Sequence, residues 1–410
     1  MAKTRRQTYP VLPVANSWWE LLDHVAARLG VGALSEEQLV AAVYAQSEAY
    51  TRQRARELAA TPDKSALAAR LRFFLTRDMG KVAGPLDELA RLGRLPAGPV
   101  WRVLDLGAGM GATALGVAEY AARRGIERVE VVSVEQHASL AKAGALLAEG
   151  LHTCGDHFAP LRWTSRAEDL SARNLGADGP FDLIVAGFVL NELWPNADAE
   201  ERADRQSELL ERWCSWLTAD GAFVALEPAL RETSRAVSVL RDRLVQRGAA
   251  HVLAPCVRTG PCPMLEVKRD WCHAERAVAL PEPLAGLARA AGLRFERLTF
   301  SYLALASAPL ERRFHSPSQD GSGEVYRVVS SPLPSKGKLE WFGCGEEGRV
   351  RLTRLDREKS ASNRGFCRAR RGDLVSIQGL VRRKSGGLIP PEANVAPIEN
   401  PDGTGLHRGD

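Results

Sequence analysis

Three glycines separated by single residues form the stretch best suited to bind a cofactor. Gly107, Gly109 and Gly111 follow the apolar run 103–106, and a helical pattern begins at Ala112. Glycine adopts positive φ and has no Cβ, so the backbone here can approach a ligand closely. The start of the following helix offers unpaired N–H groups and the positive end of the helix dipole. Glycines also serve packing alone in many strand-to-helix turns, so the turn needs further support.

An acidic residue at the end of the next predicted strand gives that support. Residues 128–134 form an apolar, β-branched run that ends at Glu135. A carboxylate at this distance from the glycines suits the hydroxyl groups of a ribose, as in dinucleotide-binding folds. The turn itself, Gly-Ala-Gly-Met-Gly after Asp105, differs from the usual dinucleotide fingerprint. The combination resembles the first motif of the class I S-adenosylmethionine-dependent methyltransferases.

This resemblance covers roughly residues 85 to 305 and implies an α/β, Rossmann-like sheet that binds S-adenosylmethionine. In that family the acidic strand end and the glycine turn hold the methionine part, and the next acidic residue holds the ribose. Glu168 and Asp169 follow a short third strand, where the fold commonly places an adenine contact. A helix cap is an equally good interpretation of that pair. The implied cofactor-binding residues are Asp105, Gly107, Gly109, Gly111, Glu135, Asp169 and Asn191.

Alternating strands and helices are predicted to bring these residues to one edge of a sheet. From about residue 100 the pattern alternates as βαβ units do. Strands are predicted at 101–106, 128–134, 161–164, 181–190, 221–226, 294–305 and 324–330, with a basic helix at 232–247. Ligands of parallel sheets lie at the carboxyl ends of the strands. Asp105, Glu135, Asn191 and Glu227 all fall at such ends.

The segment after the fourth predicted strand is expected to contact the methyl acceptor. It reads Asn191-Glu192-Leu-Trp194, which keeps the asparagine and the aromatic residue of the Asp/Asn-Pro-Pro-aromatic motif of amino-methylating enzymes but lacks its prolines. Asn191 and Glu192 are the candidate catalytic residues, and Glu192 could equally be a structural hydrogen-bond partner. Cys214 lies on the preceding helix, away from the strand ends. A covalent cysteine mechanism is therefore disfavoured, and direct displacement is expected.

Three cysteines in a Pro- and Gly-rich loop predict a metal site. Cys256, Cys262 and Cys272 lie within seventeen residues, and Pro255 and Pro263 restrict the loop beside two of them. The alternative is three small buried thiols, but buried cysteines rarely cluster in polar loops. A methyltransferase-like sheet does not need such an insertion, so metal ligation is the preferred interpretation.

Three thiolates require a fourth ligand. Cys344, flanked by glycines at a predicted strand end, is the first candidate, with Cys367 and His273 as alternatives. Four thiolates suit either a 4Fe–4S cluster or a structural zinc ion, and the spacing does not decide between them.

A second resemblance covers most of the chain after about residue 70. Cys-x5-Cys-Pro, Trp-Cys-His and a distant Cys-Gly-x-x-Gly resemble the mitochondrial small-ribosomal-subunit methyltransferase-like protein family and its bacterial relatives, as do Phe300-Ser-Tyr and Arg371-Gly-Asp. This resemblance implies binding to small-subunit ribosomal RNA during assembly. Some members are suspected to have lost methyl transfer, often with a degraded glycine turn, whereas this chain keeps the turn. The implied 4Fe–4S ligands are Cys256, Cys262, Cys272 and Cys344.

The predicted architecture has a methyltransferase-like sheet at its centre. The predicted parts are a helical N-terminal domain at 1–95, the sheet domain at 96–335 with its cysteine insertion at 250–275, a small basic β-rich domain at 336–385 and a disordered tail at 386–410. Arginines recur at 52–56, at 70–77 and through the β-rich domain, where Arg349 and Arg351 share one strand face. They form either ordinary solvated charge or an RNA-facing surface.

Composition agrees with a soluble, mildly basic protein. The net charge is +5, with 45% hydrophobic and 26% charged residues. The sequence contains no apolar run near the length of a membrane helix and no apolar leader after the first methionine. Seven cysteines in a reducing compartment do not predict a disulfide framework. A cytoplasmic, monomeric protein without membrane contact is predicted.

The predicted function is that of an S-adenosylmethionine-binding, methyltransferase-like protein. It would act on small-subunit ribosomal RNA or in small-subunit assembly and carry the four-cysteine iron–sulfur site. One alternative is a non-catalytic RNA-binding assembly factor built on the same fold. The other is a small-molecule methyltransferase with structural zinc, for which no affinity for RNA is expected.

Overall fold

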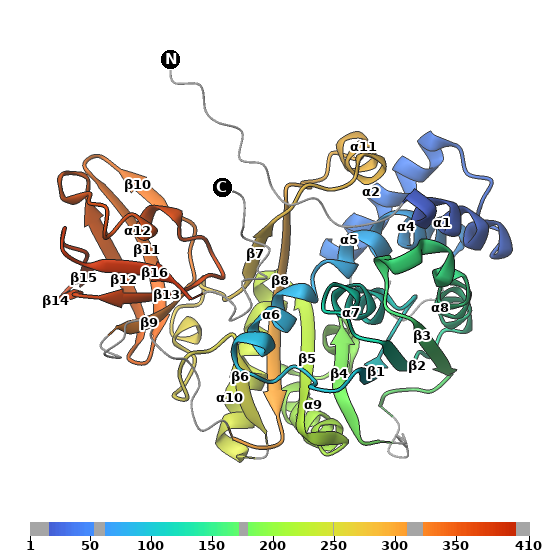
Figure 1. Ribbon diagram of the computed structural model, residues 1–410, viewed down its shortest axis with the longest axis horizontal. Coiled ribbons are helices and arrows are strands. Elements are labelled where there is room, and N and C mark those ends of the chain that lie inside the picture. The colour runs from blue at the N-terminus through green and yellow to red at the C-terminus, as the bar shows by residue number, and fades with distance from the viewer. Residues whose placement is uncertain (1–15, 53–61, 172–178, 249, 310–322, 399–410) are drawn as a thin grey trace.

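The computed structural model describes residues 16–52, 62–171, 179–248, 250–309 and 323–398 (Figure 1). The start of the chain, most of the first arginine run and the end of the predicted tail lie outside these residues. Two sheets dominate the structure, a mixed sheet flanked by helices and a smaller sheet built from the C-terminal strands (Figure 1).

The larger sheet carries the candidate cofactor site. Its strands follow the order β3-β2-β1-β4-β5-β8-β6, with β7 paired to β8. The first five strands are parallel, and β8 runs antiparallel to its neighbours. The bounds are β1 Val100–Leu106, β2 Arg128–Val134, β3 Leu161–Arg166, β4 Phe181–Gly187, β5 Leu217–Pro228, β6 His251–Ala254, β7 Ala274–Ala277 and β8 Arg297–Ala306. This order is that of a doubly wound α/β fold with one reversed strand at its far side.

A strand lies at each of the first five predicted positions, and two details differ. The fourth strand ends at Gly187 instead of 190, because Phe188 has a φ of 62°, which a strand residue does not adopt. The predicted strand at 324–330 is β9, Glu324–Val328, which belongs to the smaller sheet. In the larger sheet β8 pairs instead with β6 and β7, which flank the cysteine loop, residues 255–273.

Helices cover both faces of the larger sheet. One face packs against α7 (Ala112–Arg123), α8 (Ala138–Gly150) and the N-terminal helices, and the other against α9 (Ala199–Cys214) and α10 (Arg231–Arg247). The basic helix predicted at 232–247 is thus α10. Short elements complete this part: η2 Leu151–His157, η3 Leu190–Glu192, η4 Pro263–Leu265 and α11 Glu282–Ala290.

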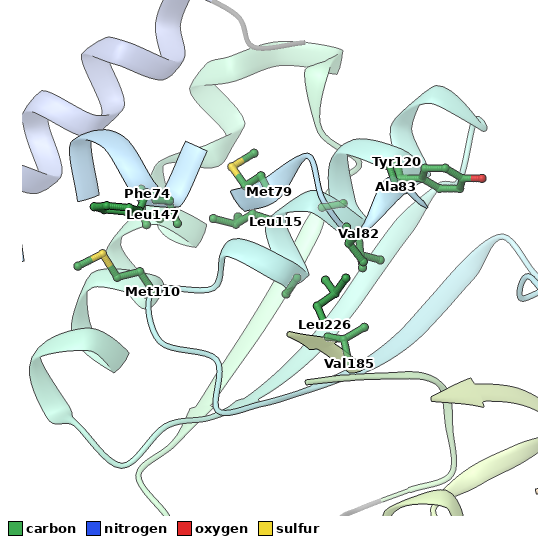
Figure 2. Close-up of a cluster of buried hydrophobic side chains, with 14 of the residues drawn as sticks. Phe74, Met79, Val82, Ala83, Met110, Leu115, Tyr120, Leu147, Val185 and Leu226 are labelled. Atoms are coloured by element: carbon green, nitrogen blue, oxygen red, sulfur yellow. The ribbon is translucent and has the colours of Figure 1, made fainter. Parts of the chain in front are cut away.

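The N-terminal helices share their core with the sheet domain. Figure 2 shows Phe74, Met79 and Val82 packed beside Leu115 and Leu147 of the sheet-flanking helices. The apolar side chains of all these elements belong to one buried cluster, so the predicted helical domain is not a separate folding unit. The elements are α1 Asn16–Arg28, α2 Glu36–Arg52, α4 Lys64–Ala69, the π-helical turn η1 Arg70–Phe74, α5 Leu75–Met79 and α6 Ala83–Arg91.

The smaller sheet has its own core around Trp341, Phe366 and Ile389. Its strand order is β14-β15-β12-β11-β9-β13-β16, with β10 paired to β11. The bounds not yet given are β10 Leu333–Ser335, β11 Lys338–Gly345, β12 Gly348–Leu355, η5 Asp356–Glu358, α12 Gly365–Arg368, β13 Leu374–Gln378, β14 Val381–Arg383, β15 Gly386–Leu388 and β16 Asn394–Pro397. The tail predicted to be disordered from 386 therefore contains two strands, because Ile389 and Val395 are buried in this core.

Two buried ion pairs connect α6 to the β-rich parts. Asp87 Oδ2 lies 2.8 Å from Arg276 Nη1 on β7. Glu88 binds Arg327 on β9 through both carboxylate oxygens, at 2.7 and 2.8 Å. None of the described helices is long and apolar enough to cross a bilayer.

Candidate functional site

The glycine turn has the backbone that its sequence predicts. Gly107, Gly109 and Gly111 have φ values of 68°, 56° and 88°, which L-residues rarely adopt. The N–H groups of Gly107 and Ala108 donate to the carbonyl of Val134, at 2.9 and 3.0 Å. These bonds tie the end of β1 to the end of β2, so the turn and Glu135 are held side by side.

The three glycines have different neighbours. A Cβ on Gly107 would lie 2.4 Å from Val189 Cγ2, and one on Gly111 would lie 2.6 Å from the ring of Trp163. A Cβ on Gly109 would meet no atom within 4 Å. Gly107 and Gly111 are therefore required by packing, and Gly109 is the point where the backbone borders open space.

A cleft of about 1550 Å³ opens at the carboxyl ends of the parallel strands. The predicted site residues that line it are Gly107, Gly109, Glu135, Asp169, Asn191 and Glu192. Asp105 and Gly111 are not among its lining residues, because Asp105 lies beneath the turn and Gly111 faces Trp163.

The carboxylate of Glu135 accepts a hydrogen bond from the glycine turn. Its Oε2 accepts from Gly109 N at 2.8 Å, and its Oε1 accepts from His137 N at 2.7 Å. A carboxylate has about four lone-pair sites, so both oxygens keep capacity for a ligand hydroxyl. Asp169 accepts from the backbone and side chain of Ser171, both at 2.8 Å, which closes a local turn, and both the helix cap and the adenine contact remain predictions.

Asp105 lies on β1, and its buried carboxylate contacts the start of α7. Its Oδ2 accepts from Ala114 N at 3.2 Å, and its Oδ1 has no hydrogen-bond partner in the described residues. Burial raises the pKa of this carboxyl to about 7, and the charge of Glu135 adds to the rise, while the Ala114 N–H opposes it. A protonated Asp105 is thus accessible near neutral pH.

Protonation of Asp105 predicts a pH-dependent stability. Its folded-state pKa lies above the ordinary value of 3.8, so the folded chain binds more protons and loses stability as pH rises between these values. Compared with Asp105→Asn, the wild type should lose about 1 kcal/mol of unfolding free energy for each pH unit between 5 and 7. Denaturant titrations of both proteins without cofactor, at several pH values, measure this. Parallel stability curves would contradict the assignment.

Asn191 serves as a structural tie. Its Nδ2 donates to Phe188 O at 2.9 Å and to Glu227 Oε2 at 2.7 Å, and Leu190 N donates to Glu227 Oε1 at 2.8 Å. The buried carboxylate of Glu227 thereby fixes the loop after β4. Only the Oδ1 atom of Asn191 remains for a ligand, which limits the catalytic role predicted for this residue. Glu192 lines the cleft, and its role stays a prediction.

The N-terminal helices supply a wall of the cleft that the sequence interpretation missed. Lys81 is buried, pairs with Asp78 at 2.9 Å and lies 4.5 Å from the ring centre of Phe188. Phe188 and Trp194, both in the loop after β4, have positive φ values of 62° and 50°. Such strained positions gather at ligand sites. The arginine run around residue 70 was the available signal, and its π-helical turn lines this wall.

The four predicted metal ligands line a second cavity, of about 50 Å³. Cys256, Cys262, Cys272 and Cys344 all border it, whereas Cys367 is exposed and lies elsewhere. His273 borders both this cavity, hereafter the cysteine cavity, and the large cleft.

Helix α10 holds the cysteine loop in place. The buried guanidinium of Arg241 donates to the carbonyls of Arg258 and Gly260, both at 2.5 Å. Arg235 Nη1 donates to the carbonyls of Met264, Val267 and Asp270 at 2.8–2.9 Å. The Cys262 N–H donates to the Asp242 carboxylate at 2.9 Å. Charged side chains of one helix therefore hold the loop backbone in a defined shape.

Three of these cysteines have thiols whose pKa is raised. Burial, followed by the proximity of Cys256, raises the pKa of Cys262, Cys272 and Cys344, that of Cys344 to about 12. In the described part of the chain, no group of three or more His, Cys, Asp or Glu residues is arranged to hold a metal ion. The predicted 4Fe–4S site is therefore not supported by the described residues.

Comparison with known protein families shows which family the chain belongs to. The sequence profile described as "Mitochondrial small ribosomal subunit Rsm22" matches residues 82–374, well over half of the chain. The chain belongs to the Rsm22 family. No curated protein sequence matches it.

Solved structures similar to this Rsm22-family chain include proteins described as methyltransferases. A protein of Listeria monocytogenes described as a class I S-adenosylmethionine-dependent methyltransferase has a TM-score of 0.38 and 13% identity, covering 73% of this chain and 91% of its own. One from Clostridium acetobutylicum ATCC 824 has a TM-score of 0.28 and 10% identity, covering 68% and 72%. The plantazolicin methyltransferase BamL has a TM-score of 0.36 and 10% identity, covering 67% and 98%. All three similarities are distant.

The basic residues of the smaller sheet divide into bound and exposed groups. Arg349 pairs with Asp270 at 3.1 Å, and Arg371 pairs with Glu275 at 2.8 Å, so both connect this sheet of the Rsm22-family chain to the cysteine loop and β7. Arg370 donates to the Cys367 and Ala369 carbonyls. Arg351, Arg368, Arg383 and Lys384 are exposed. The exposed group is better placed than Arg370 or Arg371 to contact phosphates.

Proposed function

We propose that this Rsm22-family chain binds S-adenosylmethionine and acts as a methyltransferase-like protein on small-subunit ribosomal RNA or in small-subunit assembly. The observation that carries the proposal is the cleft at the strand ends, where Gly109 borders open space beside Glu135. A closely approached backbone and a neighbouring carboxylate are what the methionine and ribose parts of this cofactor require. Family membership supplies the link to the small ribosomal subunit.

In the proposed complex the cofactor would contact Gly107, Gly109 and Glu135, with its adenine toward Asp169. Bound S-adenosylmethionine supplies an electrophilic methyl group. Asp105 would act from below the turn, by holding the start of α7 through Ala114. The loop after β4, fixed by Asn191 and Glu227, would border the methyl acceptor.

A pair of glycine variants tests cofactor binding. Gly109 and Gly125 both have positive φ, of 56° and 69°, and a Cβ on either would meet nothing within 4 Å. Only Gly109 lines the cleft. Gly109→Ala and Gly125→Ala should therefore lose a similar free energy of unfolding, about 1–2 kcal/mol. Calorimetry with S-adenosylmethionine should show affinity reduced at least tenfold in Gly109→Ala and unchanged in Gly125→Ala. Failure of the metal-containing wild type to bind would refute the cofactor assignment.

The second part of the proposal is a 4Fe–4S cluster on the four cysteines that border the cysteine cavity. On one zinc ion, thiolate sulfurs lie about 3.8 Å apart, because Zn–S bonds of about 2.3 Å meet at tetrahedral angles. Ligands of a cluster bind different iron atoms and stand further apart. In the structure the four thiols border one cavity, which supports a shared four-cysteine site. Structural zinc is the alternative, and metal analysis of anaerobically purified protein distinguishes them.

The RNA partner separates the rival functions. Methylation of small-subunit ribosomal RNA, compared between a deletion strain and its parent, distinguishes a methyltransferase from a non-catalytic assembly factor. A small-molecule methyltransferase would bind no RNA, whereas phosphate contacts would make RNA affinity fall steeply with salt. A monomeric state, a cytoplasmic location and the absence of membrane contact remain predictions.

A further inference from the structure

We infer that Trp271 and His273 form a subsite for an unpaired nucleobase of RNA, in the cleft that the glycine turn also lines. This inference deepens the proposed function and rests on it for the identification of RNA as the partner. It begins from the segment 271–275, which joins the cysteine loop to β7.

The segment forms a partition between the two cavities. Trp271, His273 and Glu275 line the large cleft, whereas Cys272 lines the cysteine cavity. Ser301 Oγ donates to the carbonyl of Cys272 at 3.1 Å, which anchors the segment to β8. The rings of Trp271 and His273, hereafter the aromatic platform, therefore stand on an anchored backbone and border the large cleft.

The two rings are arranged for stacking. The ring centres of Trp271 and His273 are 5.9 Å apart, with 19° between their planes. Trp271 Nε1 and His273 Nδ1 are buried and have no hydrogen-bond partner among the residues described. Buried polar atoms are normally paired, so the segment is incomplete without a further group. A nucleobase offers both a stacking face and edge hydrogen-bonding groups.

The charge around the platform favours a phosphate-bearing ligand. Glu275 is shared by Arg297 at 2.7 Å and Arg371 at 2.8 Å, with His273 Nε2 at 3.4 Å. Two guanidinium groups on one carboxylate leave a net positive charge. Arg294, also on the cleft, is exposed and has no ion pair within the described ranges. Phosphates flanking the bound base would meet these cations.

The size of the cleft leaves room for this second ligand. Sites for one small molecule occupy about 300–1,000 Å³, and the cleft holds about 1550 Å³. Residues near the glycine turn and residues of 271–275 lie in the same cleft. One cofactor and one extruded base can therefore occupy it together.

Fluorescence of 2-aminopurine within a short single-stranded RNA tests the subsite. Binding to the wild type should quench the fluorescence, because the base stacks on an aromatic ring. Trp271→Leu should remove the quenching and weaken RNA binding about tenfold, within the range for one stacked base. Trp271→Phe should keep most of both. Trp216→Leu, a partly exposed tryptophan outside both cavities, is the matched control and should behave as the wild type.

A crosslinking measurement on the wild-type protein tests the subsite without relying on correctly folded variants. A 4-thiouridine RNA should crosslink to the peptide that contains residues 271–275. Crosslinks only to other walls of the cleft, or quenching lost in Trp194→Leu but kept in Trp271→Leu, would overturn the subsite. Free 2-aminopurine riboside should bind more weakly than the RNA, since it lacks phosphates. Equal binding would identify a free nucleoside as the ligand and reject RNA.

The failure of this subsite can be distinguished from failure of the proposed function. S-adenosylmethionine should bind Trp271→Leu as it binds the wild type, because the glycine turn is unchanged. Cofactor binding without Trp271-dependent quenching would overturn the subsite alone. Quenching that depends on Trp271 in a protein that binds no cofactor would uphold the subsite and remove the methyltransferase assignment.

Discussion

Replacement of Cys344 by serine should abolish metal binding. Cys344 lies on β11, paired with Arg327 of β9 and Arg349 of β12, and it is the one ligand candidate that the smaller sheet contributes to the cysteine cavity. A serine hydroxyl is a poor substitute for a thiolate on iron or zinc. Metal binding contributes to folding free energy, so the C-terminal sheet should also become more sensitive to protease. Iron, sulfide and zinc contents of anaerobically purified protein measure the first effect.

The other cysteines provide the controls for this experiment. Cys367→Ser should keep the metal, because Cys367 is exposed and outside the cavity. Cys154→Ser and Cys214→Ser should keep it too, since both thiols are buried in the sheet domain. Metal lost in Cys367→Ser but kept in Cys344→Ser would move the fourth ligand. Zinc instead of iron would reject the cluster and keep the four-cysteine site.

Breaking the Glu88–Arg327 ion pair should be the most destabilising change outside the metal site. Both side chains are 4% exposed. Burial alone would raise the pKa of Glu88, but the charges of Arg327 and Arg91 lower it to about 2. Removal of one partner leaves the other charge buried and unpaired, so Arg327→Met and Glu88→Gln should each lose about 3–5 kcal/mol of unfolding free energy. Denaturant titration measures both losses.

The double variant distinguishes a lost charge pair from general damage. Glu88→Gln with Arg327→Met removes both charges of the pair and leaves only Arg91, whose side chain is 11% exposed, without its carboxylate partner, so its loss should be smaller than the sum of the single losses. Lys359→Met, which breaks an exposed pair with Asp356, is the matched control and should change stability by less than about 1 kcal/mol. Additive losses in the double variant would show that the two charges do not interact.

The same ion pair gives acid sensitivity. The folded-state pKa of Glu88 is about 2, below its ordinary value of 4.5, so its stabilisation is complete above that ordinary value. The stabilisation is lost as pH falls from 4.5 toward 2. Because Arg327 also donates to the carbonyls of Pro255 and Gly372, loss of the pair would loosen the contact between the cysteine loop and the smaller sheet.

Local patterns in the sequence were sufficient for the features that depend on neighbours along the chain. The positive φ of Gly107, Gly109 and Gly111, the strand at 128–134 and helix α10 follow from residue type and periodicity.

Features that depend on distant contacts could not be predicted in this way. The different surroundings of Gly109 and Gly111 arise because Trp163 of β3 packs against the turn. Asp105 was predicted to touch the cofactor, yet the start of α7 covers it. The tail from 386 has a polar, Pro- and Gly-rich composition, but in its described part, residues 386–398, a few buried side chains belong to the core of the smaller sheet. Such burial depends on partners that are far away in sequence.

By itself the sequence determined the glycine turn, the strands of the parallel part of the sheet and the set of candidate thiols. The tertiary structure alone decided that Cys344, and not Cys367, joins the cavity of Cys256, Cys262 and Cys272. It also decided that the N-terminal helices form a wall of the cleft and that the segment 271–275 separates the two cavities. The reason is physical: periodicity and turn chemistry act over a few residues, whereas convergence of side chains depends on strand pairing and register.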